Sequence, residues 1–219
     1  MIMYLTKTPV FIRELWPQLT WDQPPGNDTI YLTFDDGPHP EITPQVLTIL
    51  EKYKASGTFF CVGENIEKFP DTFQQLKDSQ HGIGSHTYHH LNGWATDNIT
   101  YFKNIKRAAT LTGSTLFRPP YGRIKPSQVP FVQRHYQVIM WSVLSGDFDK
   151  TISGKKCFDN VRKSARDGSI VVFHDSTKAA DRLLYALPRT LDHFSNLGYR
   201  FEALPQSREY SEKLLIVNG

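Results

Sequence analysis

Short apolar runs alternate along the chain with segments in which apolar residues recur every three or four positions. The runs are rich in β-branched and aromatic residues and predict strands, whereas the recurring pattern predicts helices. The expected strands are residues 29–34, 58–62, 82–84, 115–117, 137–141, 169–173 and 199–203. The expected helices are residues 43–53, 65–78, 98–112, 127–135, 153–166 and 181–196.

The first expected helix has a well-defined apolar face. Val46, Leu47 and Leu50 lie on that face, and Pro44 stands in the first turn, where its missing N–H costs nothing. Seven strands separated by helices predict an α/β fold whose parallel sheet is closed or nearly closed into a barrel. We expect a single domain, with an irregular N-terminal segment at residues 1–28, the barrel at 29–205 and a C-terminal tail at 206–219.

The composition is typical of one soluble globular domain. Of the 219 residues 39% are hydrophobic, and 14 Phe, 10 Tyr and 4 Trp supply bulky side chains for a core. The net charge of +3 is small and evenly spread, without a basic stripe, which excludes a nucleic-acid-binding protein. Cys61 and Cys157 stand in apolar surroundings, so we expect two buried free thiols.

The N-terminus shows no signal for export. It lacks the apolar run of roughly 7–15 residues that a secretion signal needs, and no run of roughly 18 apolar residues predicts a transmembrane segment. By default we therefore expect a cytoplasmic protein. The sequence gives no indication of the oligomeric state.

Polar residues of catalytic types gather at the ends of five expected strands. In a parallel barrel the carboxyl ends of the strands surround one mouth, so these clusters are expected to converge there. They are residues 35–36, 86–90, 118–122, 147–149 and 174–175.

The first two clusters contain candidate metal ligands. Asp35 and Asp36 are adjacent carboxylates at a strand end, where one can bind a metal while the other holds a proton; a local turn is the alternative. His86 and His90 share one face if the backbone between them is helical, a spacing that suits a divalent metal; structural or exposed histidines are the alternative. His89, one position off, is expected to point elsewhere. Two histidines and one carboxylate leave an open position for water, as in catalytic metal sites.

Two further clusters offer an arginine and another histidine. Arg118 precedes a Pro-Pro-Tyr-Gly turn that can fix it and aim a backbone N–H at the mouth; a solvated surface arginine is the alternative. His174 ends a nearly continuous apolar strand. The ordinary pKa of imidazole lies near neutrality, so His174 is a candidate general acid, with a structural histidine as the alternative.

Together these motifs resemble those of the polysaccharide deacetylase family, also called carbohydrate esterase family 4 or the NodB-homology domain. The resemblance runs from about residue 29 to residue 203. It implies a distorted (β/α) barrel with fewer than eight repeats, with residues 29–205 as the catalytic domain. The motifs are Thr33-Phe34-Asp35-Asp36-Gly37-Pro38, the pair His86 and His90, Arg118-Pro119-Pro120-Tyr121-Gly122, and His174.

The resemblance also implies an activity. Members of the family are hydrolases that depend on zinc or cobalt and remove acetyl groups from N-acetylglucosamine polymers, such as peptidoglycan or chitin-like oligosaccharides, or from acetylated xylan. The expected partner is therefore an acetylated glycan, and members often work outside the cytoplasm. By this resemblance Asp36, His86 and His90 are the metal ligands, and Asp35 is the general base, held by an ion pair with Arg118. His174 is the general acid, and the N–H of Tyr121 donates to the oxyanion. The implied substrate contacts are Pro119, Trp141 and Phe148.

One motif departs from the family. The family's Asp-x-x-Asp-Trp follows a Trp-x-Val lead, whereas here Trp141-Ser142-Val143 is followed by Leu144-Ser145-Gly146-Asp147-Phe148. Leu144 stands where similar enzymes have an aspartate that orients and charges the acid histidine. We therefore expect reduced activity unless Asp147, Asp149 or Asp175 takes that place.

Two alternatives to an N-deacetylase remain at this level. One is an O-acetyl (xylan) esterase that uses the same site, and the other is a carbohydrate-binding protein with impaired catalysis. Trp94 and Tyr88, near the second histidine, either stack on sugar rings or pack within the protein.

Overall fold

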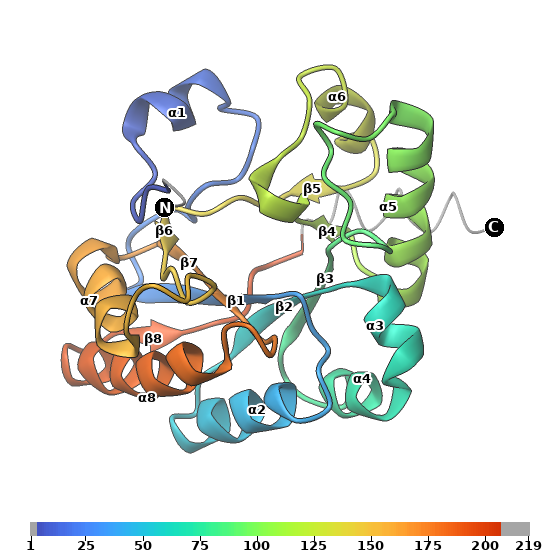
Figure 1. The fold of residues 1–219 in the computed structure, drawn as a ribbon. Coiled ribbons are helices and arrows are strands. Elements are labelled where there is room, and N and C mark those ends of the chain that lie inside the picture. Colours follow the sequence, from blue (N-terminus) through green and yellow to red (C-terminus); the bar gives the residue numbers. More distant parts are fainter. Residues whose placement is uncertain (1–3, 207–219) are drawn as a thin grey trace.

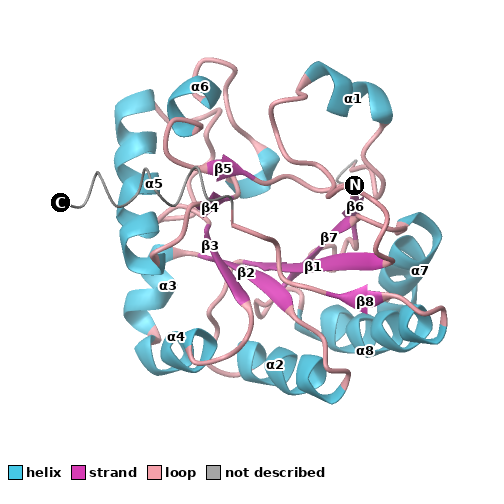
Figure 2. Ribbon diagram, turned by 180° about the vertical axis from the view of Figure 1, so that it is seen from behind, coloured by secondary structure: helices cyan, strands magenta, loops and turns pink. Residues whose placement is uncertain are grey.

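The fold is a parallel sheet curled into a half-barrel and surrounded by helices (Figures 1 and 2). A computed structural model describes residues 4–206, so the expected tail lies outside the described residues apart from Gln206. Within this range the strand order is β5-β4-β3-β2-β1-β7-β6, β8 pairs with the start of β1, and every pairing between strands is parallel. The strands are β1 (Thr29–Asp35), β2 (Gly57–Cys61), β3 (Gly82–Ser85), β4 (Leu116–Phe117), β5 (Gln137–Val138), β6 (Val143–Leu144), β7 (Ile170–His174) and β8 (Arg200–Phe201).

Helices follow most strands, as expected for a βα-repeat chain. In both views α1 and α6 lie on the other side of the sheet from α2 and α8 (Figures 1 and 2). No helix within residues 4–206 is both long and apolar enough to span a membrane. The helices are α1 (Val10–Leu15), α2 (Ile42–Lys52), α3 (Gly63–Lys68), α4 (Pro70–Lys77), α5 (Asn98–Thr112), α6 (Val129–Val132), α7 (Gly154–Ser164) and α8 (Ala180–Asn196).

The two faces of β1 contact different parts of the protein because successive side chains along a strand point to opposite sides. Leu32 and Phe34 belong to the main core, which packs the sheet against α2 and α8. Thr33 and Asp35 point to the other side, where both contact Arg118 inside the curl of the sheet. The strand thus holds the fold together with one face and builds the site with the other.

The expected barrel of about seven parallel strands is confirmed, with differences in its elements. Of the strand expected over residues 137–141, only Gln137–Val138 forms a strand (β5). Val143–Leu144 forms an additional short strand that was not expected (β6). The helix expected over residues 65–78 is divided into α3 and α4. Phe69 between them has non-helical backbone angles (φ −128°, ψ 60°) because Pro70 follows it and disfavours the helical conformation there.

The N-terminal segment, expected to be irregular, contains α1 and reaches both end strands of the sheet. Thr20 forms a parallel bridge with Ile139 beside β5, and Lys7 forms an antiparallel bridge with Val143 of β6. The Met140 N–H donates to the Thr20 carbonyl at 2.7 Å. Unpaired edge groups of a sheet favour unwanted pairing, so this segment satisfies backbone groups that the half-barrel leaves open.

The two cysteines are as expected. Cys61, in β2, and Cys157, in α7, are buried free thiols. Burial raises the pKa of the Cys157 thiol to about 12 and that of Cys61 well above its usual range. Both are therefore inert core residues.

Candidate active site

Three of the predicted metal ligands come together at the carboxyl ends of β1 and β3. Asp36 follows β1, and Asn65 donates to its backbone carbonyl at 2.7 Å. The His90 Nε2 lies 3.2 Å and the His86 Nε2 3.9 Å from Asp36 Oδ1. Potential ligand atoms of the three residues all lie within 4.8 Å of one another. One ion can therefore contact all three side chains.

The loop between the two histidines is not helical, so helical spacing is not what brings the two side chains together. Thr87 and His90 have positive φ angles of 61° and 53°, and the tight loop brings the two imidazole centroids to 5.0 Å. Asn104 of α5 fixes the loop, since its Oδ1 accepts the N–H groups of Tyr88 at 2.7 Å and His89 at 2.9 Å. Asn104 also contacts the His89 ring, which is held away from the ligand set.

Asn104 was not singled out in the sequence. Its signal is a buried amide on the apolar face of α5, next to Tyr101, Ile105 and Ala108. A polar residue at such a position needs hydrogen-bond partners, and here they are backbone groups of the ligand loop.

The protonation states suit metal binding. The His86 Nδ1–H donates to the Arg118 carbonyl at 2.8 Å, which leaves Nε2 free to bind a metal. Burial lowers the pKa of His86 to about 4, so the ring is neutral. Burial raises the pKa of Asp36, but the hydrogen bond with His90 and the charges of the nearby histidines outweigh burial and hold the pKa well below its usual range. A neutral imidazole and an ionised carboxylate are the forms that bind divalent cations.

Arg118 is fully buried, which excludes a solvated surface arginine. Its Nη1 donates to Asp35 Oδ1 and to Thr33 Oγ1, each at 2.7 Å, and its Nη2 donates to the Met140 carbonyl at 3.0 Å. Its guanidinium carbon lies 4.2 Å from the centre of the Phe60 ring. These contacts fix Asp35 beside Asp36. Thr33 was also not singled out, although it stands two residues before Asp35 and so shares its face of β1.

His174 stands beside Asp35, since the two are register neighbours on β7 and β1. Asp147 accepts two hydrogen bonds from it, one from the backbone N–H at 2.8 Å and one from Nδ1 at 2.7 Å. Burial opposes protonation of the ring, but the charge and hydrogen bond of Asp147 outweigh burial, and the pKa of His174 is raised to about 9. The imidazole is therefore protonated at neutral pH.

The structure meets the exception stated for Leu144, because one of the three candidate aspartates takes the missing place. The Leu144 side chain is buried in β6, and Asp147 supplies the carboxylate that His174 needs. The other two aspartates have other partners. Asp175 accepts from Thr43 and from the Gly37 N–H, and Asp149 accepts from Tyr4 and Thr151.

The Pro-Pro-Tyr-Gly turn lies beside the metal ligands. The Tyr121 ring is 4.7 Å from the His90 ring, and φ at Tyr121 is 60°. The N–H groups that follow donate to the carbonyls of the two prolines, whereas the Tyr121 N–H donates to none of residues 4–206. Gly122 has φ +66° and leaves no room for a side chain, because a Cβ would lie 2.6 Å from Trp141.

The remaining predicted substrate contacts border the same site. Pro119 is buried directly after Arg118, and the Arg118 guanidinium carbon lies 5.9 Å from the centre of the Trp141 ring. The Phe148 ring packs edge-on against His174 at 5.3 Å.

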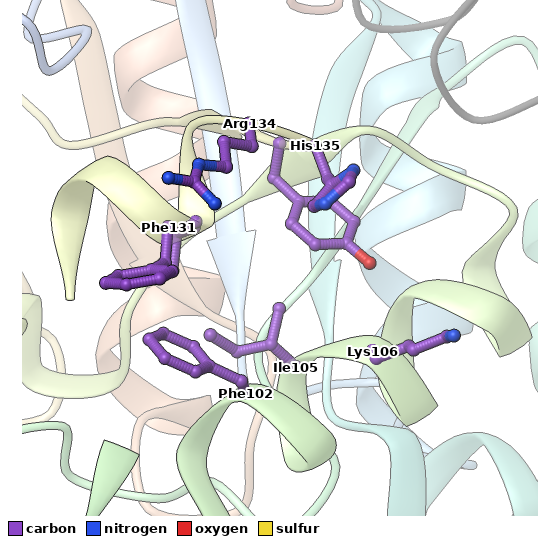
Figure 3. A pocket seen from close by; sticks show the side chains of 8 residues that line it. Phe102, Ile105, Lys106, Phe131, Arg134 and His135 are labelled. Carbon is purple, nitrogen blue, oxygen red and sulfur yellow. The ribbon is translucent and has the colours of Figure 1, made fainter. Parts of the chain in front are cut away.

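A partly open, mostly apolar pocket lies elsewhere, between α5 and α6. It has a volume of about 250 Å³. The Phe102 and Phe131 rings pack against each other in its wall, with their centroids 5.5 Å apart, and Lys106, Arg134 and His135 also line it (Figure 3). None of its lining residues belongs to the ligand cluster or to the two carboxylate pairs. This pocket is therefore separate from the residues gathered at the carboxyl ends of the strands.

Comparisons with known proteins agree on one family. A family model described as polysaccharide deacetylase matches residues 22–136. A peptidoglycan-N-acetylglucosamine deacetylase of Bacillus cereus is 32% identical over 207 residues, which cover 90% of this chain and 97% of that protein. A chitooligosaccharide deacetylase of Azorhizobium caulinodans is 32% identical over 158 residues, 68% of this chain and 75% of that protein.

A solved structure agrees with these sequence relatives. It is a peptidoglycan N-acetylglucosamine deacetylase in complex with an N-oxidanyl-benzamide compound, superposes with a TM-score of 0.78 at 31% identity, and the match covers 86% of this chain and 91% of that one.

Proposed function

This chain belongs to the polysaccharide deacetylase family, and from that premise we propose that it hydrolyses N-acetyl groups of N-acetylglucosamine-containing glycans, of the peptidoglycan or chitin type, and releases acetate. The enzyme is thus a hydrolase of carbon–nitrogen bonds other than peptide bonds. One observation carries the proposal. The ends of the strands carry a ligand set for a divalent metal, a buried Arg118–Asp35 pair and an Asp147–His174 pair in which Asp147 is buried.

The ligand set fits a metal because the three side chains converge and the hydrogen bond of His86 to the Arg118 carbonyl uses Nδ1, which leaves Nε2 for the metal. Asp36, His86 and His90 would hold it, and His₂–carboxylate sets are typical of zinc, with cobalt as the alternative. When bound, the metal supplies Lewis acidity toward the acetamide carbonyl.

The protein groups divide the proton transfers. Asp35, fixed by Arg118, takes the proton of the attacking water as general base. The N–H of Tyr121 donates to the oxygen that becomes negative when the carbonyl is attacked. His174 gives its Nε2 proton to the departing sugar amine, since Asp147 occupies Nδ1. We also propose that Pro119, Trp141 and Phe148 contact the substrate.

The test is acetate release from N-acetylglucosamine oligomers by purified protein. Activity should be lost after chelation and return when zinc or cobalt is restored. His86→Ala, assayed at the same metal concentrations, should stay inactive. Absence of acetate with every metal would overturn the proposal, and release from O-acetyl xylan alone would favour an esterase. The alternative of a disabled glycan-binding protein rested on Leu144 and loses that basis with the Asp147–His174 pair.

A further inference from the structure

An exposed patch of two aromatic rings and one cation lies next to the metal ligands. Tyr121 and Trp94 have 62% and 59% of their surface exposed. The guanidinium carbon of Arg123 lies 5.2 Å from the centre of the Trp94 ring and 5.9 Å from that of Tyr121. We call these three residues the Trp94 shelf. Because the Tyr121 ring also contacts His90, the shelf begins at the metal site and extends away from it.

The shelf is held by hydrogen bonds between two loops. The Gly93 N–H donates to the Arg123 carbonyl at 3.2 Å, and the Trp94 Nε1–H donates to the Ile124 carbonyl at 3.1 Å. The side-chain amide of the buried Gln128 donates to the Gly93 carbonyl at 3.1 Å. Gly93 has no space for a side chain, because a Cβ would lie 2.5 Å from the Arg123 carbonyl oxygen. The exposed tryptophan is therefore fixed in place, and its exposure is part of the fold.

Tyr88, the other aromatic residue near the second histidine, has a different role. It is buried, donates to Glu67 at 2.6 Å and carries the Arg107 guanidinium carbon 3.5 Å from its ring centre. Tyr88 packs within the protein, so Trp94 is the residue of the two that can meet a ligand.

The charge of Arg123 has no carboxylate partner among the described residues. Within residues 4–206 its side chain forms no ion pair with any carboxylate, and it is exposed beside the rings. The planar guanidinium group binds carboxylates through two parallel hydrogen bonds. Aromatic rings offer the flat apolar surface against which the C–H face of a sugar packs.

We propose that the Trp94 shelf binds the sugar next to the one that is deacetylated, and that Arg123 selects glycans with a carboxylate at that position over neutral glycans. This inference rests on the proposed deacetylation. Peptidoglycan provides such carboxylates, on the lactyl group of the neighbouring sugar or on the attached peptide, whereas chitin oligosaccharides carry none.

The experiment compares kcat/KM for acetate release from three glycans. They are a peptide-free peptidoglycan tetrasaccharide with free lactyl carboxylates, the same compound with those carboxylates amidated, and an N-acetylglucosamine tetramer. Arg123→Gln should lower kcat/KM on the first glycan by about tenfold, mainly through KM, the size expected for a lost charge-assisted hydrogen bond. On the two neutral glycans the loss should stay within about twofold, whereas Trp94→Ala should lower kcat/KM on all three.

A matched control is Arg134→Gln. Arg134 is also exposed and its guanidinium carbon lies 4.9 Å from the centre of the Phe131 ring, but it borders the distant pocket. This variant should match the wild type on every glycan. It removes the same charge from the protein, so it separates a contact at the shelf from a general effect of net charge.

The outcomes are distinguishable. Arg123 dependence on the peptide-free strand assigns the carboxylate to the sugar. A peptide-bearing strand is assayed beside the three glycans, and dependence confined to that strand assigns the carboxylate to the peptide. Equal losses on charged and neutral glycans, or no loss on any, overturn the selection by Arg123. If the wild type releases no acetate from any glycan, the proposed function itself fails.

Discussion

At the scale of single residues, the charge of Asp147 decides the protonation of His174. A general acid is active only below its own pKa, which for His174 is raised to about 9. The wild-type rate should therefore persist through neutral pH and fall as the pH rises through about 9. Asp147→Asn keeps the shape of the side chain but removes the charge, so the alkaline limb of the pH–rate profile should move to lower pH. The rate at pH 8 should fall at least about tenfold.

The profile of kcat against pH and an NMR titration of the His174 ring measure this directly. Asp149→Asn is the matched control, because that carboxylate contacts Tyr4 and Thr151 instead of His174. An alkaline limb that stays in place in Asp147→Asn would refute the role of this pair.

Asp175 makes stability depend on pH in the opposite way from most carboxylates. It is fully buried between Thr43 and Gly37, and burial raises its pKa to about 8. An aspartate of the unfolded chain ionises near pH ~3.9. Folding therefore favours the protonated form, so the stabilisation is complete below about pH 4 and is lost as the pH rises through about 8.

Asp175→Asn should remove this loss, because an amide is neutral and can still contact Thr43 and Gly37. Urea unfolding at pH 5 and pH 9 should show a smaller fall in the free energy of unfolding for the variant than for the wild type. Asp71→Asn, at an exposed position of α4, should behave as the wild type. Equal pH dependence in Asp175→Asn and the wild type would contradict the buried, protonated state.

The resemblance implied the Asp35–Arg118 pair but left three candidate aspartates for the partner of His174. The adjacent Asp35 and Asp36 at a strand end, and His174 at another, are set by strand alternation and could be predicted. Which aspartate meets His174 depends on the path of the loop after β6, which includes Gly146 at φ +82°. No local pattern encodes that path, so the sequence could not choose among Asp147, Asp149 and Asp175.

At the scale of elements, α5 holds the ligand loop through Asn104. The loop between the histidines contains residues at positive φ and no helical hydrogen bonds, so the two bonds to the Asn104 Oδ1 replace regular structure there. Asn104→Ala should lower metal affinity about tenfold, as loss of a supporting contact around a metal does. Competition with a chelator of known affinity measures the change.

Two variants on the same helix make the result specific. Asn104→Asp keeps the side-chain oxygen that accepts both N–H groups and should keep most of the affinity. Lys103→Ala, on the exposed face, should change nothing. Unchanged affinity in Asn104→Ala would mean that the loop holds its shape without α5.

Helices and strands could be predicted from the sequence where the repeat of apolar residues extends over many positions. α5 has the expected bounds because Tyr101, Ile105 and Ala108 repeat at helical spacing and Asp97 caps its start. β6 was not predicted because two residues are too few to show a pattern. It forms a strand because it pairs with β7. The division at Pro70 was readable in principle, since proline disfavours a helical residue before it.

At the scale of the whole molecule, the N-terminal segment supports the ends of the sheet. The Thr20 N–H donates to the Val138 carbonyl at 3.0 Å. Thr20→Pro removes this donor, and the free energy of unfolding should fall by about 1–3 kcal/mol. Thr20→Val keeps the backbone N–H and should lose much less. Denaturant unfolding of both variants compares them, and equal stabilities would show that the bridge contributes nothing.

The same segment bears on the order in which the chain folds during synthesis. Thr8, near the start, donates to the Trp141 carbonyl, a partner 133 residues later in the chain. The segment around Thr8 is made before its partner and must therefore wait until most of the barrel has been synthesised. Contacts between such distant positions slow folding, because the loop between them must close before they form. Until then β5 and β6 expose their edges, so the late intermediate, more than the finished enzyme, is the form in which this protein is prone to aggregate.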